Sequence, residues 1–207
     1  MNNGASTGGA TGAKAQNASW PDGYGRQVFD SVDSTLSEAA RQASELTGST
    51  WILAQEQTAA RGRRGRSWAT PRGNFAATLM MRRSESPSTA ALRSFVASLA
   101  LRRAFVATTR DEGAFTLKWP NDVLLNGGKV AGILLESIGD FLAIGIGVNL
   151  AHAPGADQVE AGALRPVSVV AETGKVVPPE VFLDALAAEY AQLETQFQTY
   201  GFAPIRT

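Results

Sequence analysis

The sequence contains no cysteine and a single histidine, His152. Disulfides, thiolate metal sites and cysteine nucleophiles are therefore excluded. One histidine cannot form a multi-histidine metal site, and a catalytic triad that depends on it is not expected. Any chemistry must rely on Lys, Arg, Asp and Asn side chains and on a soluble cation. The lack of cysteine also suits a reducing compartment, and we expect a cytoplasmic protein.

Long hydrophobic runs are absent as well. No segment approaches the roughly eighteen apolar residues of a membrane-spanning helix. Residues 1–19 lack the apolar core of a signal peptide and consist mainly of Gly, Ala, Ser, Thr and Asn. We expect residues 1–19 to be a disordered leader with no DNA-reading domain, and residues 20–207 to form one folded domain that contacts neither DNA nor a membrane.

The chain has no excess of either charge, because 19 basic side chains balance 19 acidic ones. This balance argues against an ordinary basic nucleic-acid-binding protein. Hydrophobic residues make up 44% of the 207 positions, which is enough for a sizeable core in one large domain.

The hydrophobic spacing predicts strands and helices without strict alternation. Strands are expected at residues 28–32, 50–54, 74–81, 115–118, 123–125, 129–136 and 141–148. Helices are expected from a Thr35–Glu38 capping box to Gly48, from Pro87, at residues 167–173, and after Pro179. Asn126-Gly127 is a hairpin turn signal. We therefore expect an α+β (mixed α/β) domain with a mixed, largely antiparallel sheet flanked by helices.

Two of the expected helices carry apolar stripes that predict packing against a core or a partner. The stripe of the helix after Pro87 consists of Leu92, Phe95, Val96, Leu99 and Val106. The stripe of the last helix consists of Leu183, Leu186, Tyr190, Leu193 and Phe197.

An arginine-rich segment, Arg61–Trp68, reads RGRRGRSW between two expected strands. Its four guanidinium groups repel one another, and its glycines add backbone freedom. Such a segment suits a loop that closes over an anion, because guanidinium groups match phosphate and carboxylate oxygens. The alternative is a loop that binds RNA or single-stranded DNA. We also expect residues 59–67 to be mobile without a ligand.

A second polar segment, Lys118–Asp122, reads KWPND and follows an expected strand. Pro120 interrupts strand pairing, so Asn121 and Asp122 are expected at the edge of a strand. Their oxygens suit a Mg²⁺ ion that retains most of its waters. Lys129 begins the next strand and can stabilise negative charge on a phosphate or carboxylate oxygen.

Together these groups match the needs of adenylation, in which a carboxylate attacks the α-phosphorus of ATP. The substrate supplies the nucleophile, so the protein has only to orient the reactants and neutralise charge. The missing cysteine is then no obstacle. No Walker sequence is present, so nucleotide binding cannot be argued from a phosphate loop.

Several segments resemble those of bacterial biotin protein ligases in order and spacing. They are Asp33-Ser34-Thr35, Gln57-Thr58, RGRRGRSW at 61–68, KWPND at 118–122, KVAGILLE at 129–136 and GIGVNL at 145–150. The resemblance spans roughly residues 24–203. It implies the catalytic core shared by biotin and lipoate ligases and class II aminoacyl-tRNA synthetases. It also implies that biotin and ATP with Mg²⁺ give biotinyl-5′-AMP, and that biotin then passes to a lysine of a biotin carboxyl carrier domain. The oligomeric state stays open, with a homodimer as one option.

The resemblance also implies roles for individual residues. Lys129 and Arg63 are implied to be catalytic. The residues implied around biotin are Ser34, Thr35, Leu36, Gln57, Arg61, Gly62, Arg63, Lys129, Gly132, Leu134, Gly145 and Gly147. The residues implied around the nucleotide are Arg63, Arg64, Arg66, Trp68, Asn121, Asp122 and Asn149. Asp122 and Asn121 are also the candidate Mg²⁺ ligands.

The sequence departs from the family pattern in three places. Ala60 stands where the family usually has glycine, at a cost of about 1 kcal/mol if this position needs a positive φ. Leu36 stands where the family often has asparagine. After Ile205-Arg206-Thr207 the family normally continues into a small β-barrel, so we expect a shortened form that lacks this barrel and an N-terminal DNA-binding domain. A lipoate or octanoate ligase of the same fold is the nearest alternative, although its arginine-glycine motif differs.

Overall fold

The computed structural model describes residues 19–119, 121–155, 158–160 and 162–205. The expected leader, apart from residue 19, lies outside the described residues, as do Pro120 and residues 206–207.

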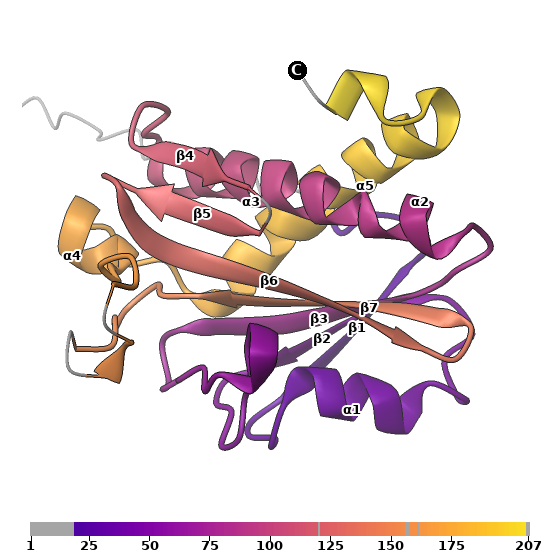
Figure 1. Ribbon diagram of the computed structural model, residues 1–207, viewed down its shortest axis with the longest axis horizontal. Coiled ribbons are helices and arrows are strands. Elements are labelled where there is room, and N and C mark those ends of the chain that lie inside the picture. Colours follow the sequence, from indigo (N-terminus) through magenta and orange to yellow (C-terminus); the bar gives the residue numbers. More distant parts are fainter. Residues whose placement is uncertain (1–18, 120, 156–157, 161, 206–207) are drawn as a thin grey trace, which may run out of the picture.

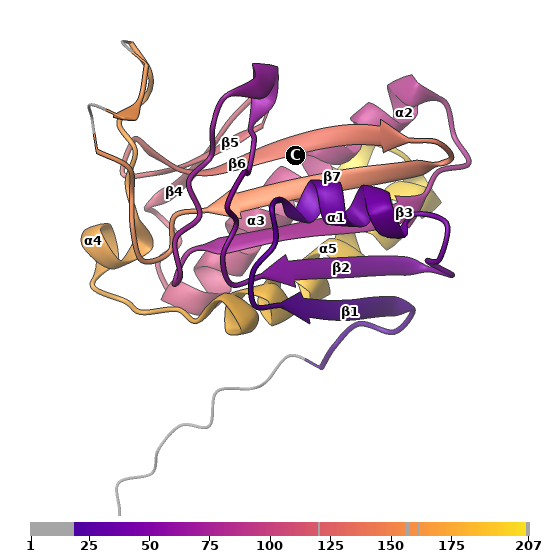
Figure 2. The same ribbon diagram turned by 90° about the horizontal axis from the view of Figure 1, so that it is seen from below.

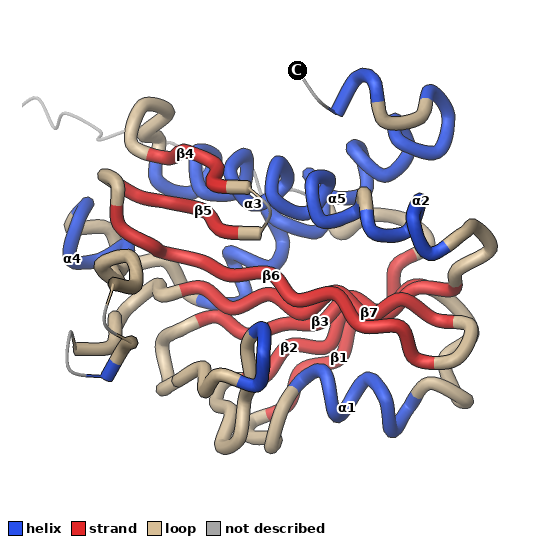
Figure 3. The backbone as a smooth tube through the Cα atoms, in the orientation of Figure 1, coloured by secondary structure: helices blue, strands red, loops and turns tan. Residues whose placement is uncertain are grey.

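The described residues form a seven-stranded sheet (Figures 1 and 3). Its strands in spatial order are β1 (Tyr24–Phe29), β2 (Ser49–Ala54), β3 (Phe75–Arg82), β7 (Phe141–Val148), β6 (Gly128–Ile138), β5 (Asp122–Leu125) and β4 (Phe115–Lys118). Only β1 and β2 pair in parallel, and all other neighbours are antiparallel. The predicted mixed, largely antiparallel sheet is therefore confirmed.

Helices cover both faces of this sheet. The long helices α3 (Arg93–Thr109) and α5 (Pro179–Tyr200) lie on one face, and α1 (Thr35–Gln42) lies on the other (Figures 1 and 2). The larger hydrophobic core fills the α3–α5 side, and a smaller core under α1 includes Leu36. The remaining helical elements are short: α2 (Pro87–Ala91), α4 (Val169–Thr173), and the 3₁₀ turns η1 (Arg63–Gly65) and η3 (Ala203–Ile205).

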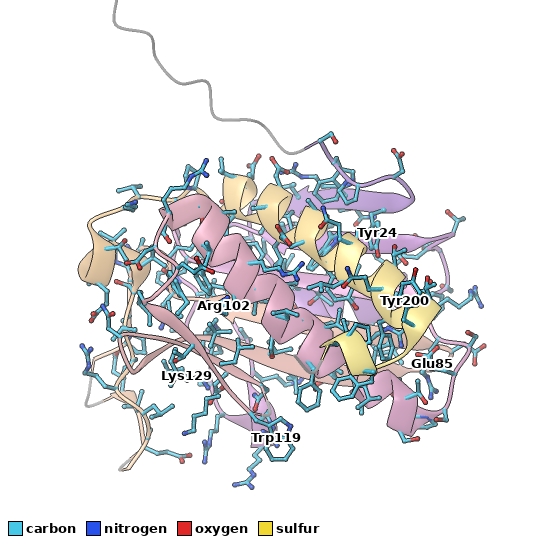
Figure 4. All side chains as sticks on the ribbon, turned by 90° about the horizontal axis from the view of Figure 1, so that it is seen from above. Tyr24, Glu85, Arg102, Trp119, Lys129 and Tyr200 are labelled. Carbon is cyan, nitrogen blue, oxygen red and sulfur yellow. The ribbon has the colours of Figure 1, made fainter. Side chains whose placement is uncertain are left out.

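The two long helices differ in how well their stripes predict burial. All five predicted stripe residues of α5 are buried. In α3, which lies beside α5 over the sheet (Figure 4), the fully buried hydrophobic side chains are instead Val96, Ala97, Ala100, Leu101, Ala104 and Phe105. Of the predicted stripe only Val96 is buried, because α3 packs against both the sheet and α5 and small alanines permit this close approach.

The start of α1 differs from the predicted capping box. The N-cap is Ser34 rather than Thr35, and no side chain caps the helix. The Thr35 backbone N–H instead donates to Gln57 Oε1 at 2.8 Å, while the Glu38 carboxylate accepts from Arg41 and Gln42. A tertiary partner has thus replaced the local cap. The helix ends at Gln42 and not at Gly48.

Several strand and turn predictions are confirmed, with one shift. Asn126 and Gly127 both have positive φ, as their hairpin turn requires. The strands Phe115–Lys118 and Phe141–Val148 have their predicted bounds. The first strand is Tyr24–Phe29 instead of residues 28–32, and Val32 forms only an isolated bridge with Gln57.

Candidate active site

A cavity of about 840 Å³ opens on the α1 side of the sheet. The arginine-rich loop, α1 and the segment before α4 lie on this same side (Figures 1 and 2). The sequence-predicted residues that line it are Ser34, Thr35, Leu36, Gln57, Arg61, Gly62, Arg63, Arg64, Arg66, Trp68, Asn121, Asp122, Lys129, Gly132, Leu134, Gly145 and Asn149. Only Gly147 is outside this set, because the Trp68 indole covers it.

Lys129 and Asp122 face each other across the β5–β6 hairpin. Their Nζ and Oδ1 atoms are 2.7 Å apart, an ion pair whose geometry is not that of a hydrogen bond. The register between β5 and β6 shifts between Val123 and Leu124, which places Lys129 opposite Leu124. Lys129 Nζ also lies 5.7 Å from the centroid of the Trp68 ring. The lysine is thus held between a carboxylate and an aromatic face at the cavity wall.

The arginine-rich loop forms a small hairpin of its own. Arg61 and Ser67 form a bridge, and the Trp68 N–H donates to the Ala60 carbonyl at 3.0 Å. Arg64 at its tip has a φ of 59°, a conformation that costs a non-glycine residue energy. Ala60 is not among the non-glycine residues with positive φ, so its replacement of the family glycine introduces no such strain.

Three of the four loop arginines are held by acceptors on other segments. Arg61 makes two contacts of 3.2 and 2.9 Å to the Glu136 carboxylate on β6. Arg63 Nη1 donates to Asn121 Oδ1 at 2.7 Å. Arg66 pairs at 2.6 Å with Glu160, in the segment between β7 and α4. The loop arginines and Lys129 on β6 therefore line the same cavity, with three of the arginines held by acceptors from three other segments.

Glycines let bulky side chains lie flat on the sheet within the cavity. A Cβ on Gly147 would overlap the Trp68 indole nitrogen, and one on Gly132 would lie 3.4 Å from Trp68 Cζ3. A Cβ on Gly145 would lie 2.8 Å from Leu36. The Leu36 side chain thus supplies an apolar wall over β7, where asparagine would present an amide.

The sequence analysis missed one wall of the cavity. This wall comes from the segment between β7 and α4, including Pro154, Val159, Glu160, Leu164 and Pro166. Its signal was length: connections longer than about 12–15 residues without regular structure are usually functional or disordered. Asn149, at the start of this segment, is buried, and its side-chain amide donates to the Val167 carbonyl at 3.1 Å.

Metal-binding capacity in the cavity is small. Among the described residues, no group of three or more His, Cys, Asp or Glu side chains is placed to hold a metal ion. Asn121 Oδ1 already accepts from Arg63, and Asp122 already faces Lys129. These two residues fit a Mg²⁺ that arrives with phosphate oxygens better than a resident metal, because Mg²⁺ commonly takes one or two carboxylates plus phosphates and waters.

The sequence profile of the biotin/lipoate A/B protein ligase family matches residues 28–150. A biotin--[acetyl-CoA-carboxylase] ligase from Paracoccus denitrificans is 56% identical over 84% of this chain and 75% of its own length. The chain belongs to the biotin/lipoate A/B protein ligase family. Another relative, the biotin--[acetyl-CoA-carboxylase] ligase of Mycobacterium tuberculosis, is 36% identical over 68% of this chain and 54% of its own length.

Solved structures of the ligase family share this fold. The biotin protein ligase of Aquifex aeolicus in complex with biotin and ATP aligns with a TM-score of 0.75 at 27% identity, over 87% of this chain and 74% of that one. The Leishmania major biotin protein ligase in complex with biotinyl-5-AMP gives a TM-score of 0.71 at 29% identity, over 83% and 75% of the two chains. No helix in the part of the chain that the structure describes is long and apolar enough to cross a membrane.

Proposed function

We propose that this chain is an ATP-dependent biotin protein ligase whose catalytic domain comprises residues 20–207. In the first step a biotin carboxylate oxygen attacks the α-phosphorus of ATP and pyrophosphate leaves, giving biotinyl-5′-AMP. In the second step the ε-amine of a carrier-domain lysine attacks the acyl carbon and AMP leaves. The names of its relatives and the ligands of its structural neighbours support this reading.

The observation that carries the proposal is the convergence of Lys129, Arg63 and Trp68 on one cavity. A carboxylate and a triphosphate repel each other, so a site that joins them must supply fixed positive charge at the reacting oxygens. Lys129 and Arg63 are the proposed catalytic cations, while Arg64 and Arg66 take the remaining phosphates. The indole of Trp68 provides a flat surface for adenine, and Asn121 and Asn149 offer amide groups to the nucleotide.

Biotin is proposed to lie against the sheet, between α1 and the arginine-rich loop. Ser34, Thr35 and Gln57 supply polar groups at the α1 end, and Leu36, Leu134 and Gly145 supply apolar surface. Arg61 and Gly62 close the loop side. Water is excluded when the loop orders over the adenylate, which matters because a mixed anhydride hydrolyses readily.

Mg²⁺ is proposed to enter with ATP, neutralising charge on its phosphates. Asp122 is the carboxylate proposed to meet it, with Asn121 as a second oxygen ligand. The Asp122 carboxylate would then interact with both the metal and Lys129, which it already contacts. The acceptor is proposed to be a biotin carboxyl carrier domain and the compartment the cytoplasm.

Pyrophosphate release with MgATP tests this proposal when biotin and lipoate are compared as substrates. We expect release with biotin and none with lipoate, followed by a mass gain of one biotinyl group on a carrier domain. A clear preference for lipoate would instead identify a lipoate ligase. An oligonucleotide affinity that falls steeply with salt, without pyrophosphate release, would favour the RNA- or DNA-binding alternative.

A further inference from the structure

A chain of four buried or half-buried polar side chains runs beneath the α1 end of the cavity. Thr78 Oγ1 donates to Thr35 Oγ1 at 2.9 Å, and Thr35 Oγ1 donates to Gln57 Oε1 at 3.1 Å. Gln57 Nε2 then donates to Thr70 Oγ1 at 3.0 Å. Thr35 and Gln57 line the cavity, whereas Thr78 and Thr70 lie behind them with 0% and 2% exposure. Such a network can be worth more than the sum of its single bonds, because linked hydrogen bonds polarise one another.

The direction of every hydrogen bond in this chain follows from one backbone group. The Thr35 backbone N–H can only donate, and it donates to Gln57 at 2.8 Å. The atom that it meets must therefore be the amide oxygen, which places the Gln57 NH₂ group toward Thr70. The Thr35 hydroxyl can then only donate to the same oxygen. Its single proton is used, so Thr78 has to be the donor in the remaining bond.

The polarity that results at the cavity is specific. Thr35 Oγ1 donates its proton to Gln57 and accepts from Thr78, which leaves one lone pair on this oxygen for a ligand donor. The Gln57 side-chain oxygen accepts two hydrogen bonds from Thr35, and one of its two N–H groups donates to Thr70. The other N–H is left for a ligand acceptor. An acceptor and a donor side by side match a group that carries both N–H and C=O. A cyclic urea has both, and a dithiolane ring has neither.

We propose that Thr78 is a positioning residue: it holds the Thr35 hydroxyl, whose proton goes to Gln57, in the rotamer from which its free lone pair accepts from a ligand, so that the cavity selects a ligand head group with an N–H donor. This inference rests on the proposed function and names the feature of biotin that the site reads. Thr78 holds Thr35 from β3, where its strand neighbours are Ile52 on β2 and Gly145 on β7. Without the Thr78 bond, the Thr35 side chain loses the shorter of the two hydrogen bonds that hold its rotamer.

The test compares Thr78→Val, which has the same shape without the hydroxyl, with Thr78→Ser, which retains it. The two probes are biotin and a biotin analogue with a cyclic carbonate in place of the urea, which keeps C=O and lacks both N–H groups. Dissociation constants are measured by calorimetry or by displacement. Thr109→Val is the matched control, because Thr109 is also fully buried but its hydroxyl bonds only within α3.

We expect Thr78→Val to weaken biotin about tenfold, the size of one lost hydrogen bond. Carbonate binding should change less than about twofold, since the carbonate has no N–H to donate to the Thr35 hydroxyl and so does not depend on its position. Thr78→Ser and Thr109→Val should both stay within about twofold of the wild type for biotin. The Michaelis constant for ATP should not change in any variant.

If Thr78→Val weakens the binding of both probes equally, the threonine only fills space. If biotin binding does not change, Thr78 positions nothing. Either result overturns the inference and leaves the ligase function standing. A wild-type protein that does not bind biotin overturns both. Should Thr78→Val not fold, Thr78→Ala, which removes the same hydroxyl without adding volume, has the same expected outcome, with Thr78→Ser as its rescue.

Discussion

At the scale of single residues, the cationic side chains of the cavity are held in place by ion pairs with carboxylates of the same chain. Lys129 contacts Asp122, Arg61 contacts Glu136, and Arg66 contacts Glu160. The arginine pairs are partly exposed, and exposed pairs contribute only about 0–1 kcal/mol. Anionic ligand oxygens can therefore replace these carboxylates at a small cost in free energy. The arginine side chains already lie at the cavity before the ligand binds.

Lys129→Ala and Arg63→Ala should each lower the rate of biotin-dependent pyrophosphate release by one to several powers of ten. The reason is the loss of one oriented charge that stabilises the transition state, which typically costs about 10²–10³ in rate. Arg103→Ala serves as the control, because Arg103 lies on α3 and pairs with Glu189 on the other side of the sheet. Rates that match the wild type in both variants would remove the assigned roles.

Gly147→Ala should displace the Trp68 indole, since the added Cβ would overlap its nitrogen. Overpacking of this kind costs about 1–3 kcal/mol, so ATP binding should weaken about five- to a hundredfold. Gly132→Ala meets the same indole at 3.4 Å and should change the affinity less than about threefold. Titration with ATP decides the matter; similar affinities for the two variants would show that the indole does not define the nucleotide site.

At the scale of elements, the arginine-rich loop is a hairpin fastened at its base. Repulsion between its arginines favours an open loop. The Arg61 contacts with Glu136 on β6 and, at 3.4 Å, with Ser37 on α1 oppose this opening. The loop is therefore joined to both the sheet and the helix that border the cavity, so its opening requires the Arg61 contacts to break.

Glu136→Gln should raise the rate of proteolytic cleavage between residues 59 and 67 in the ligand-free protein. The expected increase is about two- to fivefold, because a partly exposed ion pair contributes up to about 1 kcal/mol. Asp30→Asn removes a similar exposed pair to Arg72, just beyond the loop, and provides the control. Biotin with ATP should protect both variants. Resistance of the ligand-free wild type and of Glu136→Gln to cleavage would contradict a mobile loop.

At the scale of the whole molecule, one buried ion pair joins the two long helices. Arg93 on α3 contacts Glu194 on α5 at 2.7 Å, with 5% and 4% of their side chains exposed. Glu85 also contacts Arg93, and the Tyr190 hydroxyl donates to Glu194. Burial, and then the charge of Glu194, raises the pKa of Tyr190 well above its usual value. The tyrosine therefore remains a donor to the carboxylate.

Glu194→Gln should lower the free energy of unfolding by about 3 kcal/mol, because the buried Arg93 then keeps only the partly exposed Glu85 as a carboxylate partner. Denaturant titration measures this change. The matched control is Glu189→Gln, which removes an exposed pair to Arg103 between the same two helices and should cost less than about 0.5 kcal/mol. Equal effects of the two substitutions would show that burial adds nothing to the pair.

Local patterns predict much of the fold. The α5 stripe, the Asn126-Gly127 turn and the bounds of β4 and β7 were readable because periodicity and turn chemistry act between near neighbours. Nearly all the residues that the sequence motifs identified also lie in the cavity. Their spacing along the chain is a property of the sequence alone.

Tertiary structure decided what those residues touch. The Thr35 cap failed because Gln57, 22 positions away, supplied a better partner for its N–H. The buried face of α3 was set by two neighbours at once, and the wall around Glu160 formed from a segment with no periodic signal. Contacts between distant segments depend on how elements pack in three dimensions, and no local pattern encodes them.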